Sequence, residues 1–300
     1  MKRLLFITGN RLGDVVISTG LLRAFQNRYG DAHVTIVCGP VAASLFDCWP
    51  GVDRVIRLEK KRFDLHWLKL WWDCFPTRWD HIVDLRGSAM SYLLNARARS
   101  ISRGGRRAGL RLHHHGALLQ CCPTPQPEVH TTDKYREKAA SRLPKGPAWI
   151  AIAPTANWCG KIWPASSFRA LCERFIRDGY RIAVFYGPGS QEKARAAPFL
   201  AEPACHHVDV GGDRALPEVI AMLQRCSAFI GNDSGLMHLA AAAGTPTIGL
   251  FGPSRASEYA PSGPCATYIQ AEGPEGEAPI DGISVDKVFD VACDLLRRGQ

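Results

Sequence analysis

The stretch AFIGNDSGLMHLAAAAGTPTIGLF, residues 228–251, contains a complete strand–helix–strand unit. The apolar run at 228–231 predicts a strand, the alanine-rich segment 234–243 predicts a helix, and the run 247–251 predicts a second strand. Gly244 ends the helix and Pro246 precedes the next strand. Because two strands joined by a helix lie parallel in one sheet, this stretch predicts an α/β fold.

The same alternation recurs along most of the 300 residues, a length that favours two domains. Further strands are predicted at 4–8, 33–37, 55–58, 81–85, 150–153 and 182–186, and further helices at 14–29, 88–98, 131–143, 166–178, 190–200, 217–226 and 285–298. Prolines and glycines at 144–147 interrupt the pattern, so we place a domain boundary between residues 145 and 146. The prediction is therefore a domain at 1–145 and a second domain at 146–300.

The composition is that of a globular protein, with 46% hydrophobic and 22% charged residues. No segment reaches the roughly 18 apolar residues of a membrane span. The start, MKRLLFITGNRLGD, turns polar too early for a secretory signal, so we expect a soluble, cytoplasmic protein. The 11 cysteines are scattered, which favours free thiols.

Charge is distributed unevenly between the two expected domains. Residues 1–145 carry 24 Lys and Arg against 12 Asp and Glu, whereas residues 146–300 carry 13 against 16. The densest basic segment contains Arg97, Arg99, Arg103, Arg106, Arg107 and Arg111. Such a face attracts nucleic acid, anionic lipid headgroups or a phosphorylated glycan, and a merely solvated basic surface is the alternative.

The first motif, GNRLGD at 9–14, lies between the first strand and the first helix. Its glycines allow a tight turn, but it lacks the third glycine of the dinucleotide fingerprint, which argues against a nicotinamide enzyme. Asp14 stands near the helix N-terminus, where it can cap the helix, act as a general base, or do both.

The second motif, PTANWCGKIWP at 154–164, follows the first strand of the second half. Lys161 can neutralise a phosphate as a point charge, and an exposed loop lysine is the alternative. Trp163 is assigned to packing.

The third motif lies in the opening stretch, where a strand ends and a helix begins. We predict that Asp233 caps this helix and that the N–H groups of 234–236 form an anion site, with Gly235 allowing close approach. His238 lies one turn after Ser234 on the same face. The turn at 251–254 either lines a nucleotide pocket or is turn geometry alone.

Two other segments have competing interpretations. The adjacent histidines 113–115 and cysteines 121–122 do not have the spacing of a zinc site, so no metal is expected. Trp67, Trp71 and Trp72, close to basic residues, either pack in the core or contact a lipid surface.

Together these motifs resemble glycosyltransferase family nine, the ADP-heptose:lipopolysaccharide heptosyltransferases, over nearly the whole chain. The resemblance implies a GT-B fold: two Rossmann-like parallel-sheet domains with an interdomain cleft. It implies an inverting, metal-independent transfer with Asp14 as general base, Lys161 on the diphosphate, and a donor loop. The predicted donor-site residues are Thr155, Lys161, Asp233, Ser234, Gly235 and His238, with Gly252 and Pro253 as further lining. Acceptor binding is assigned to Arg11, Arg103, Arg106 and Arg107.

The predicted function is transfer of a sugar, heptose from ADP-heptose, onto inner-core lipopolysaccharide or a related anionic, lipid-linked glycan. The enzyme would work at the cytoplasmic face of the inner membrane, with no cofactor and no nucleic-acid partner. The alternatives are a transferase of the same fold with another nucleotide-sugar, and a non-enzymatic polyanion-binding scaffold. A nucleotide-sugar epimerase or dehydrogenase would need the missing fingerprint, and a nucleic-acid-binding module would leave the loop 233–238 unexplained.

Overall fold

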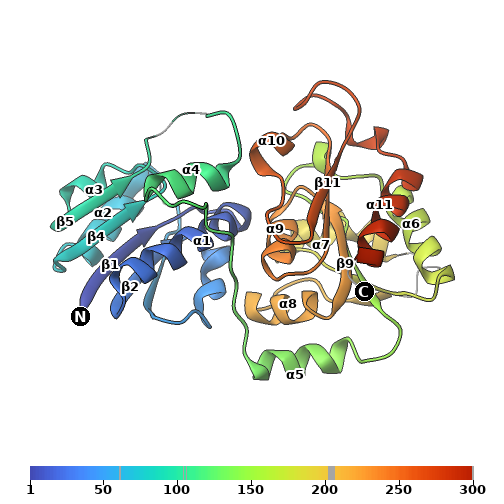
Figure 1. The fold of residues 1–300 in the computed structure, drawn as a ribbon, viewed down its shortest axis with the longest axis horizontal. Helices are drawn as coiled ribbons and strands as arrows, with labels where there is room; N and C mark the ends of the chain where they lie inside the picture. The colour runs from blue at the N-terminus through green and yellow to red at the C-terminus, as the bar shows by residue number, and fades with distance from the viewer. Residues whose placement is uncertain (61, 104, 106, 202–206, 299–300) are drawn as a thin grey trace. The chain divides into compact units, whose positions relative to one another are not determined.

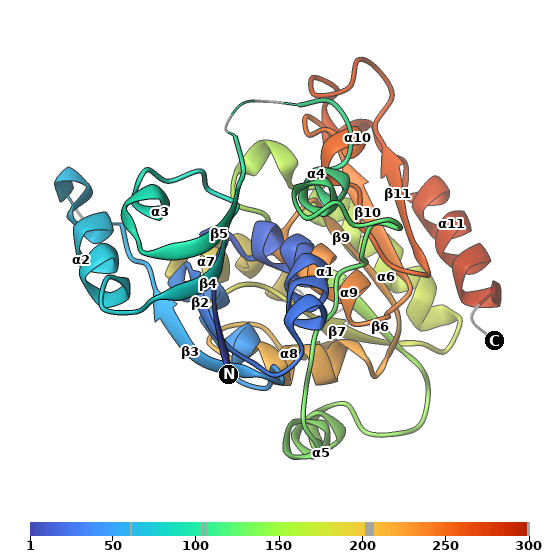
Figure 2. The same ribbon diagram turned by 60° about the vertical axis from the view of Figure 1, so that its left-hand side comes forward.

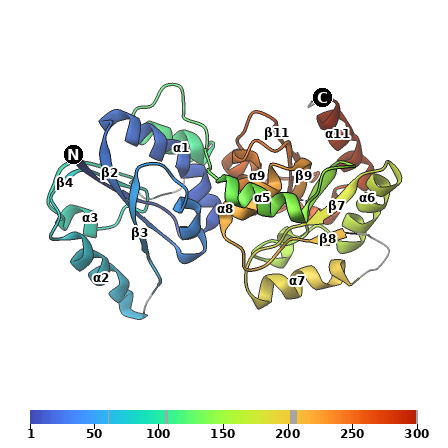
Figure 3. The same cartoon turned by 90° about the horizontal axis from the view of Figure 1, so that it is seen from below.

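The computed structural model describes residues 1–60, 62–103, 105, 107–201 and 207–298 (Figure 1). The chain divides into two compact units, Met1–Glu128 and Val129–Gln300. The second unit thus begins before the predicted boundary at 145/146, because helix α5 (Asp133–Arg142) packs against α8 (Leu216–Leu223). Figure 3 shows α5 beside α8.

The first unit is built on a five-stranded, entirely parallel sheet in the order β3-β2-β1-β4-β5. Its strands are β1 (Lys2–Ile7), β2 (Ala32–Cys38), β3 (Val52–Arg57), β4 (Trp79–Asp84) and β5 (Ala96–Ile101). Its helices are α1 (Leu12–Tyr29), η1 (Pro40–Phe46), η2 (Arg62–Asp64), α2 (Leu65–Cys74), α3 (Met90–Leu93) and α4 (Arg111–Leu118).

Alternate residues of β1 face opposite sides of this sheet, as the pleat requires. On one side Phe6 meets Phe25 of α1, with ring centroids 6.2 Å apart. On the other side Leu5 and Ile7 share a buried cluster with Leu70 of α2 and Met90 of α3. The sheet is therefore covered on both faces.

The second unit contains a six-stranded parallel sheet in the order β11-β10-β9-β6-β7-β8. Its strands are β6 (Trp149–Ala153), β7 (Arg181–Val184), β8 (His207–Asp209), β9 (Cys226–Asn232), β10 (Thr247–Phe251) and β11 (Ala266–Gln270). The remaining helices are η3 (Cys159–Lys161), α6 (Ala165–Arg177), α7 (Ser190–Leu200), α9 (Gly235–Ala242), α10 (Ala256–Tyr259), η4 (Ile280–Gly282) and α11 (Val285–Arg298).

A buried apolar cluster joins one face of this sheet to α6 and α11. Helix α9 packs against β9 and β10, and a side chain at Gly249 would collide with Met237, whose sulfur lies 2.3 Å from the position of a Cβ. The small residues of the opening stretch therefore let a helix lie close to the strands.

The two parallel-sheet α/β domains of the GT-B expectation are confirmed, although several elements differ from the prediction. The helix expected at 88–98 is wrong beyond residue 93, since β5 occupies 96–101. The strands β8 and β11 were not predicted. Within the described residues, no helix combines the length and apolar character needed to cross a membrane.

Candidate active site

Most of the predicted site residues follow the carboxyl ends of three neighbouring strands of the second sheet. Thr155 and Lys161 come after β6, Asp233 and Ser234 after β9, and Gly252 after β10. Because β10, β9 and β6 are adjacent and parallel, these ends meet at one edge of the sheet. That is the edge at which parallel α/β sheets bind ligands.

The centre of this edge is an ion pair between Lys161 and Asp233. The Lys161 ammonium donates a hydrogen bond to the Asp233 carboxylate, and the two side chains are 21% and 7% exposed. The prediction that Asp233 caps the helix is therefore wrong. Ser234, with extended φ −149° and ψ 170°, is the N-cap residue, and its side chain makes no capping hydrogen bond.

Within the described residues, five buried side-chain N or O atoms lack a hydrogen-bond partner, and three of these lie at this edge. They are Ser234 Oγ at the end of β9, Ser254 Oγ after β10, and Gln270 Oε1 at the end of β11. Buried polar atoms are rarely left unpaired, because each loses its hydrogen bonds to water. Their clustering at one edge indicates a surface built to bind a polar ligand. Ser254 was considered only as part of the turn at 251–254, and Gln270 was not among the predicted site residues.

Asn232 holds the loops of this edge together. Its side chain is fully buried, and its Oδ1 accepts a hydrogen bond of 3.0 Å from the N–H of Trp163. Its Nδ2 donates to the carbonyls of Ala153 and Thr155, both at 3.4 Å. An amide that both donates and accepts is needed here, so Asn232 fixes the loop that carries Lys161.

His238 is buried on the first turns of α9, 5% exposed. Burial lowers the pKa of its imidazole to about 4; the neighbouring carboxylate of Asp233 acts in the opposite sense, and Lys161 adds to the lowering. The ring is therefore neutral near pH 7. A neutral imidazole can donate or accept a hydrogen bond at the site without adding charge.

This lowered pKa predicts a pH-dependent stability. The unfolded chain takes up a proton at His238 near pH 6.5, whereas the folded chain does so only near pH 4. Stability contributed by the neutral ring is thus fully present above pH 6.5 and falls as the pH drops towards 4, by about 3 kcal/mol at most. Denaturant titrations of wild type and His238→Gln between pH 4.5 and 7.5 should show a smaller loss in the variant. Equal losses would contradict the assignment.

The other predicted donor residues are mixed in character. Thr155 is buried and contributes its carbonyl to Asn232. Gly252 is packed against Ile280, which would lie 2.5 Å from a Cβ, and its carbonyl accepts from Gln270 Nε2 at 2.9 Å. Packing alone thus explains this glycine. Trp163 is fully buried, and its indole donates to the Ile283 carbonyl at 2.9 Å, as the packing assignment predicted.

In the first unit, the turn after β1 leads directly into α1, the helix that carries Asp14. Helix α1 begins at Leu12 after the exposed N-cap Arg11, so Asp14 lies in the first turn rather than at the cap. A side chain at Gly9 would lie 2.7 Å from the Asp14 Cβ, which explains why this turn needs glycine. Asp14 is partly exposed at the carboxyl edge of the first sheet.

The adjacent strand β4 ends in a second ordered loop that the sequence did not reveal. The buried Asp84 carboxylate accepts hydrogen bonds from the backbone N–H groups of 86–88 and from the hydroxyls of Ser88 and Ser91. This loop places the half-buried Arg86 guanidinium 3.0 Å from Asn10 Oδ1 and 4.6 Å from the Trp67 ring centroid. Arg86 is thereby held beside the turn between β1 and α1 as a candidate anion-binding group.

The arginines assigned to acceptor binding are only partly located. Arg103 and Arg107 are exposed beyond the carboxyl end of β5, and Arg106 lies outside the described residues.

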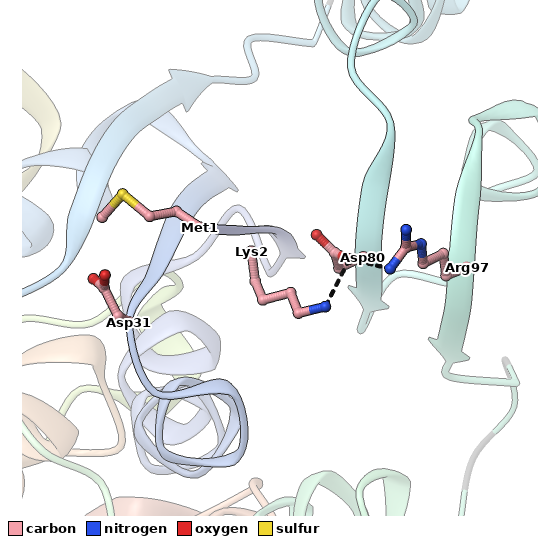
Figure 4. A pocket seen from close by; sticks show the side chains of 5 residues that line it. All are labelled: Met1, Lys2, Asp31, Asp80 and Arg97. Atoms are coloured by element: carbon pink, nitrogen blue, oxygen red, sulfur yellow. Dashed lines mark hydrogen bonds and ion pairs between the residues drawn. The ribbon is translucent and has the colours of Figure 1, made fainter.

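Two further features of the first unit have side chains that could bind a ligand. His113 and His114 of α4 bind different partners, Thr124 Oγ1 at 3.1 Å and the Ala108 carbonyl at 2.9 Å. Over the described part of the chain, no three His, Cys, Asp or Glu side chains are grouped to hold a metal ion. A depression of about 490 Å³ is lined by Met1, Lys2, Asp31, Asp80 and Arg97 (Figure 4).

This depression lies at the amino ends of the strands, away from the loops described above. Asp80 accepts a hydrogen bond from the Arg3 N–H and pairs with Lys2 at 3.5 Å and Arg97 at 3.2 Å. The backbone hydrogen bond is the main cause that lowers its pKa. Because the carboxylate and its cations satisfy one another, we read the cluster as structural.

Comparison with known proteins agrees with this arrangement. Residues 119–279, more than half of the chain, match the model of "Glycosyltransferase family 9 (heptosyltransferase)". The chain is 33% identical over 151 residues to lipooligosaccharide heptosyltransferase 2 of Haemophilus influenzae, which covers 49% of this chain and 42% of that protein. It is 23% identical over 290 residues to lipopolysaccharide heptosyltransferase 2 of Salmonella typhimurium, covering 84% and 83%.

Among solved structures, ADP-heptose lps heptosyltransferase II of E. coli superposes with a TM-score of 0.83 at 22% identity, covering 99% of both chains. That likeness shows the shared fold. The family match, the two parallel-sheet units and the motifs at their strand ends lead to one conclusion: this chain belongs to glycosyltransferase family 9 and is a sugar-transferring enzyme.

Proposed function

We propose that this enzyme transfers heptose from ADP-heptose to an anionic, lipid-linked glycan of the lipopolysaccharide core. The observation that carries the proposal is the donor cradle, by which we mean Lys161, Asp233, Ser234, Ser254 and Gln270. It combines a cation, a helix N-terminus without a side-chain cap, and buried polar atoms without partners. The names of the relatives described above supply the sugar, the nucleotide and the acceptor class.

The donor cradle suits a nucleoside diphosphate sugar. The N–H groups at the start of α9 and the Lys161 ammonium would bind the diphosphate, whose negative charge grows as the sugar leaves. Ser254 and Gln270, further along the edge, would bind the nucleoside. Asp233 carries negative charge, so we assign it to orienting Lys161 and to the sugar hydroxyls. With lysine and backbone N–H groups in this role, the transfer would need no metal ion.

The first unit would bind the acceptor. Asp14 would accept the proton of the acceptor hydroxyl as its oxygen attacks the anomeric carbon from the side opposite the diphosphate, which inverts that centre. Arg86, Arg11 and the exposed arginines after β5 would bind carboxylate or phosphate groups of the glycan. Because such an acceptor is anchored in lipid, the enzyme would act at the cytoplasmic face of the inner membrane.

Calorimetric titration of ADP, ADP-heptose, UDP and UDP-glucose into the purified enzyme, with chelator present, tests the donor. We expect micromolar binding of ADP and ADP-heptose and binding at least about tenfold weaker for the uridine pair. Tighter binding of the uridine pair would discard heptose and favour another nucleotide-sugar. Absence of binding by all four would favour the alternative of a polyanion-binding scaffold.

A further inference from the structure

Helix α2 carries apolar side chains on two opposite faces. On the inner face, His66, Leu70 and Cys74 are buried, and Leu70 and Cys74 belong to the core beneath the sheet. The outer face carries a stripe that recurs every three or four residues, one side of a helix. Its members and their exposed fractions are Leu65 (53%), Leu68 (62%), Trp72 (73%) and, directly after the helix, Phe75 (52%).

Further exposed apolar side chains lie on the neighbouring elements. Phe63, before α2, is 79% exposed, and Tyr92 and Leu93 of α3 are 65% and 69% exposed. Helix α3 contacts α2, and Figure 2 shows the two side by side. We call these three side chains and the stripe on α2 the α2–α3 surface. It holds seven of the eleven exposed large apolar side chains of the described residues, so their clustering is a local property of this face.

Packing within the first unit does not explain the α2–α3 surface, because α2 already faces the core of that unit with its other side. Contiguous exposed apolar patches mark interaction sites, since their hydration disfavours leaving them in water. Large aromatic side chains beside lysine and arginine are the composition of helices that lie in a membrane interface.

Charge around the α2–α3 surface favours an anionic partner. Lys60, Arg62 and Lys69 are exposed on the same segment, and Arg62 lies 4.8 Å from the Phe63 ring centroid. Two carboxylates lie on this segment: Glu59 is exposed beside Lys60, and Asp73 of α2 is paired with Arg54 at 3.8 Å. The unit Met1–Glu128 as a whole carries 19 Lys and Arg against 10 Asp and Glu. With the apolar stripe inserted in the membrane interface, these basic side chains would bind anionic lipid headgroups.

We propose that the α2–α3 surface docks this enzyme on a membrane that contains anionic lipids. Leu68, Trp72 and Phe75 insert at the level of the headgroup and acyl-chain boundary, and Lys60, Arg62 and Lys69 contact headgroup phosphates. The inference deepens the proposed function and rests on it in one respect, the reason for docking. A docked enzyme would be held where a lipid-linked acceptor is anchored.

Flotation of the full-length enzyme with phosphatidylcholine vesicles, with and without phosphatidylglycerol, tests this. The variant Leu68→Ser/Trp72→Ser removes two apolar side chains that are exposed, so folding should be retained, as near-ultraviolet circular dichroism and melting will check. Val41→Ser/Tyr268→Ser is the matched control, because Val41 and Tyr268 are 51% and 46% exposed elsewhere on the chain. We expect wild type and control to float with anionic vesicles and the test variant to lose at least about tenfold in partition coefficient.

Two further readouts separate the possible partners. Lys69→Gln and added salt should weaken binding to anionic vesicles, because headgroup attraction is screened. Wild type that fails to float, or a test variant that floats like wild type, would overturn the proposal. So would a wild-type dimer that Leu68→Ser/Trp72→Ser converts to monomer without any vesicle binding, since the occupant would then be a second copy.

The same variants distinguish this proposal from the function of the site. Docking predicts that Leu68→Ser/Trp72→Ser keeps wild-type affinity for ADP and wild-type turnover of a delipidated acceptor, while turnover of vesicle-bound acceptor falls. Failure of ADP binding in every variant, wild type included, would count against the donor assignment and leave the flotation result unaffected.

Discussion

Replacement of Asp14 by asparagine is expected to lower kcat by about 10²–10⁴-fold, the contribution of a positioned general base. Asparagine keeps the shape of the side chain but accepts no proton at neutral pH. Asp14 lies in the first turn of α1 at the carboxyl edge of the first sheet, and the donor cradle is built entirely from the second unit. The Kd for ADP should therefore stay within a few-fold of wild type, as calorimetry would show.

A matched control is Asp31→Asn, which removes an exposed carboxylate from the amino edge of the same sheet. It should leave kcat unchanged. Loss of the Asp14 charge near a helix N-terminus costs about 0.3–1 kcal/mol, so the melting temperature of Asp14→Asn should move only slightly. Turnover of Asp14→Asn at the wild-type rate would refute the base assignment, and equal loss in both variants would point to a general charge effect.

Replacement of Lys161 by alanine is expected to impair donor use, both binding and transfer, and separately to lower stability. Donor binding should weaken by at least about tenfold, and kcat should fall by roughly 10²–10³-fold, because a cation no longer meets the departing diphosphate. The enzyme should also lose stability, by up to about 3–5 kcal/mol, because Asp233 is 7% exposed and would keep a buried charge without its cation. ADP calorimetry, single-turnover transfer and urea unfolding measure the three quantities.

The double variant Lys161→Met/Asp233→Asn tells these effects apart. It removes both charges of the pair, so most of the lost stability should return, whereas donor affinity and transfer should not. Asp233→Asn alone would report how much of the remaining defect belongs to the carboxylate. Recovery of donor affinity in the double variant would mean that the ion pair only supports the fold.

The sequence alone was sufficient for the fold class and for the edge at which most of the predicted site residues lie. Apolar runs such as 247–251 and helical periods such as 285–298 are local patterns, and the structure has the same bounds for both. Once the strands are known to be parallel, their carboxyl ends must share an edge, so motifs after separate strands must gather there. The family resemblance followed from those motifs and is confirmed.

Elements with weak local patterns were missed. The strand β5 reads ARARSI, small and charged residues at the sheet edge, and its first three residues were assigned to a helix. The strand β8 has three residues, and β11 is the other edge strand of its sheet. Such strands form because a neighbouring strand has backbone N–H and C=O groups available for hydrogen bonding. Which strand is the neighbour depends on the order of strands in the sheet. The domain boundary shifted for a similar reason, since contact with α8 decides where α5 belongs.

What the sequence determined about this protein is thus the set of local elements and the residue types at their ends. The tertiary structure decided which of those residues meet. In the structure Asp233 pairs with Lys161 and does not cap the helix. Gln270 lies at the carboxyl edge of the second sheet, and Arg86 lies at that of the first sheet. Helix capping involves residues that are close together in the sequence, so local patterns can predict it. An ion pair between positions 161 and 233 depends on β6 and β9 being adjacent, and no local pattern of charge or hydrophobicity specifies that adjacency.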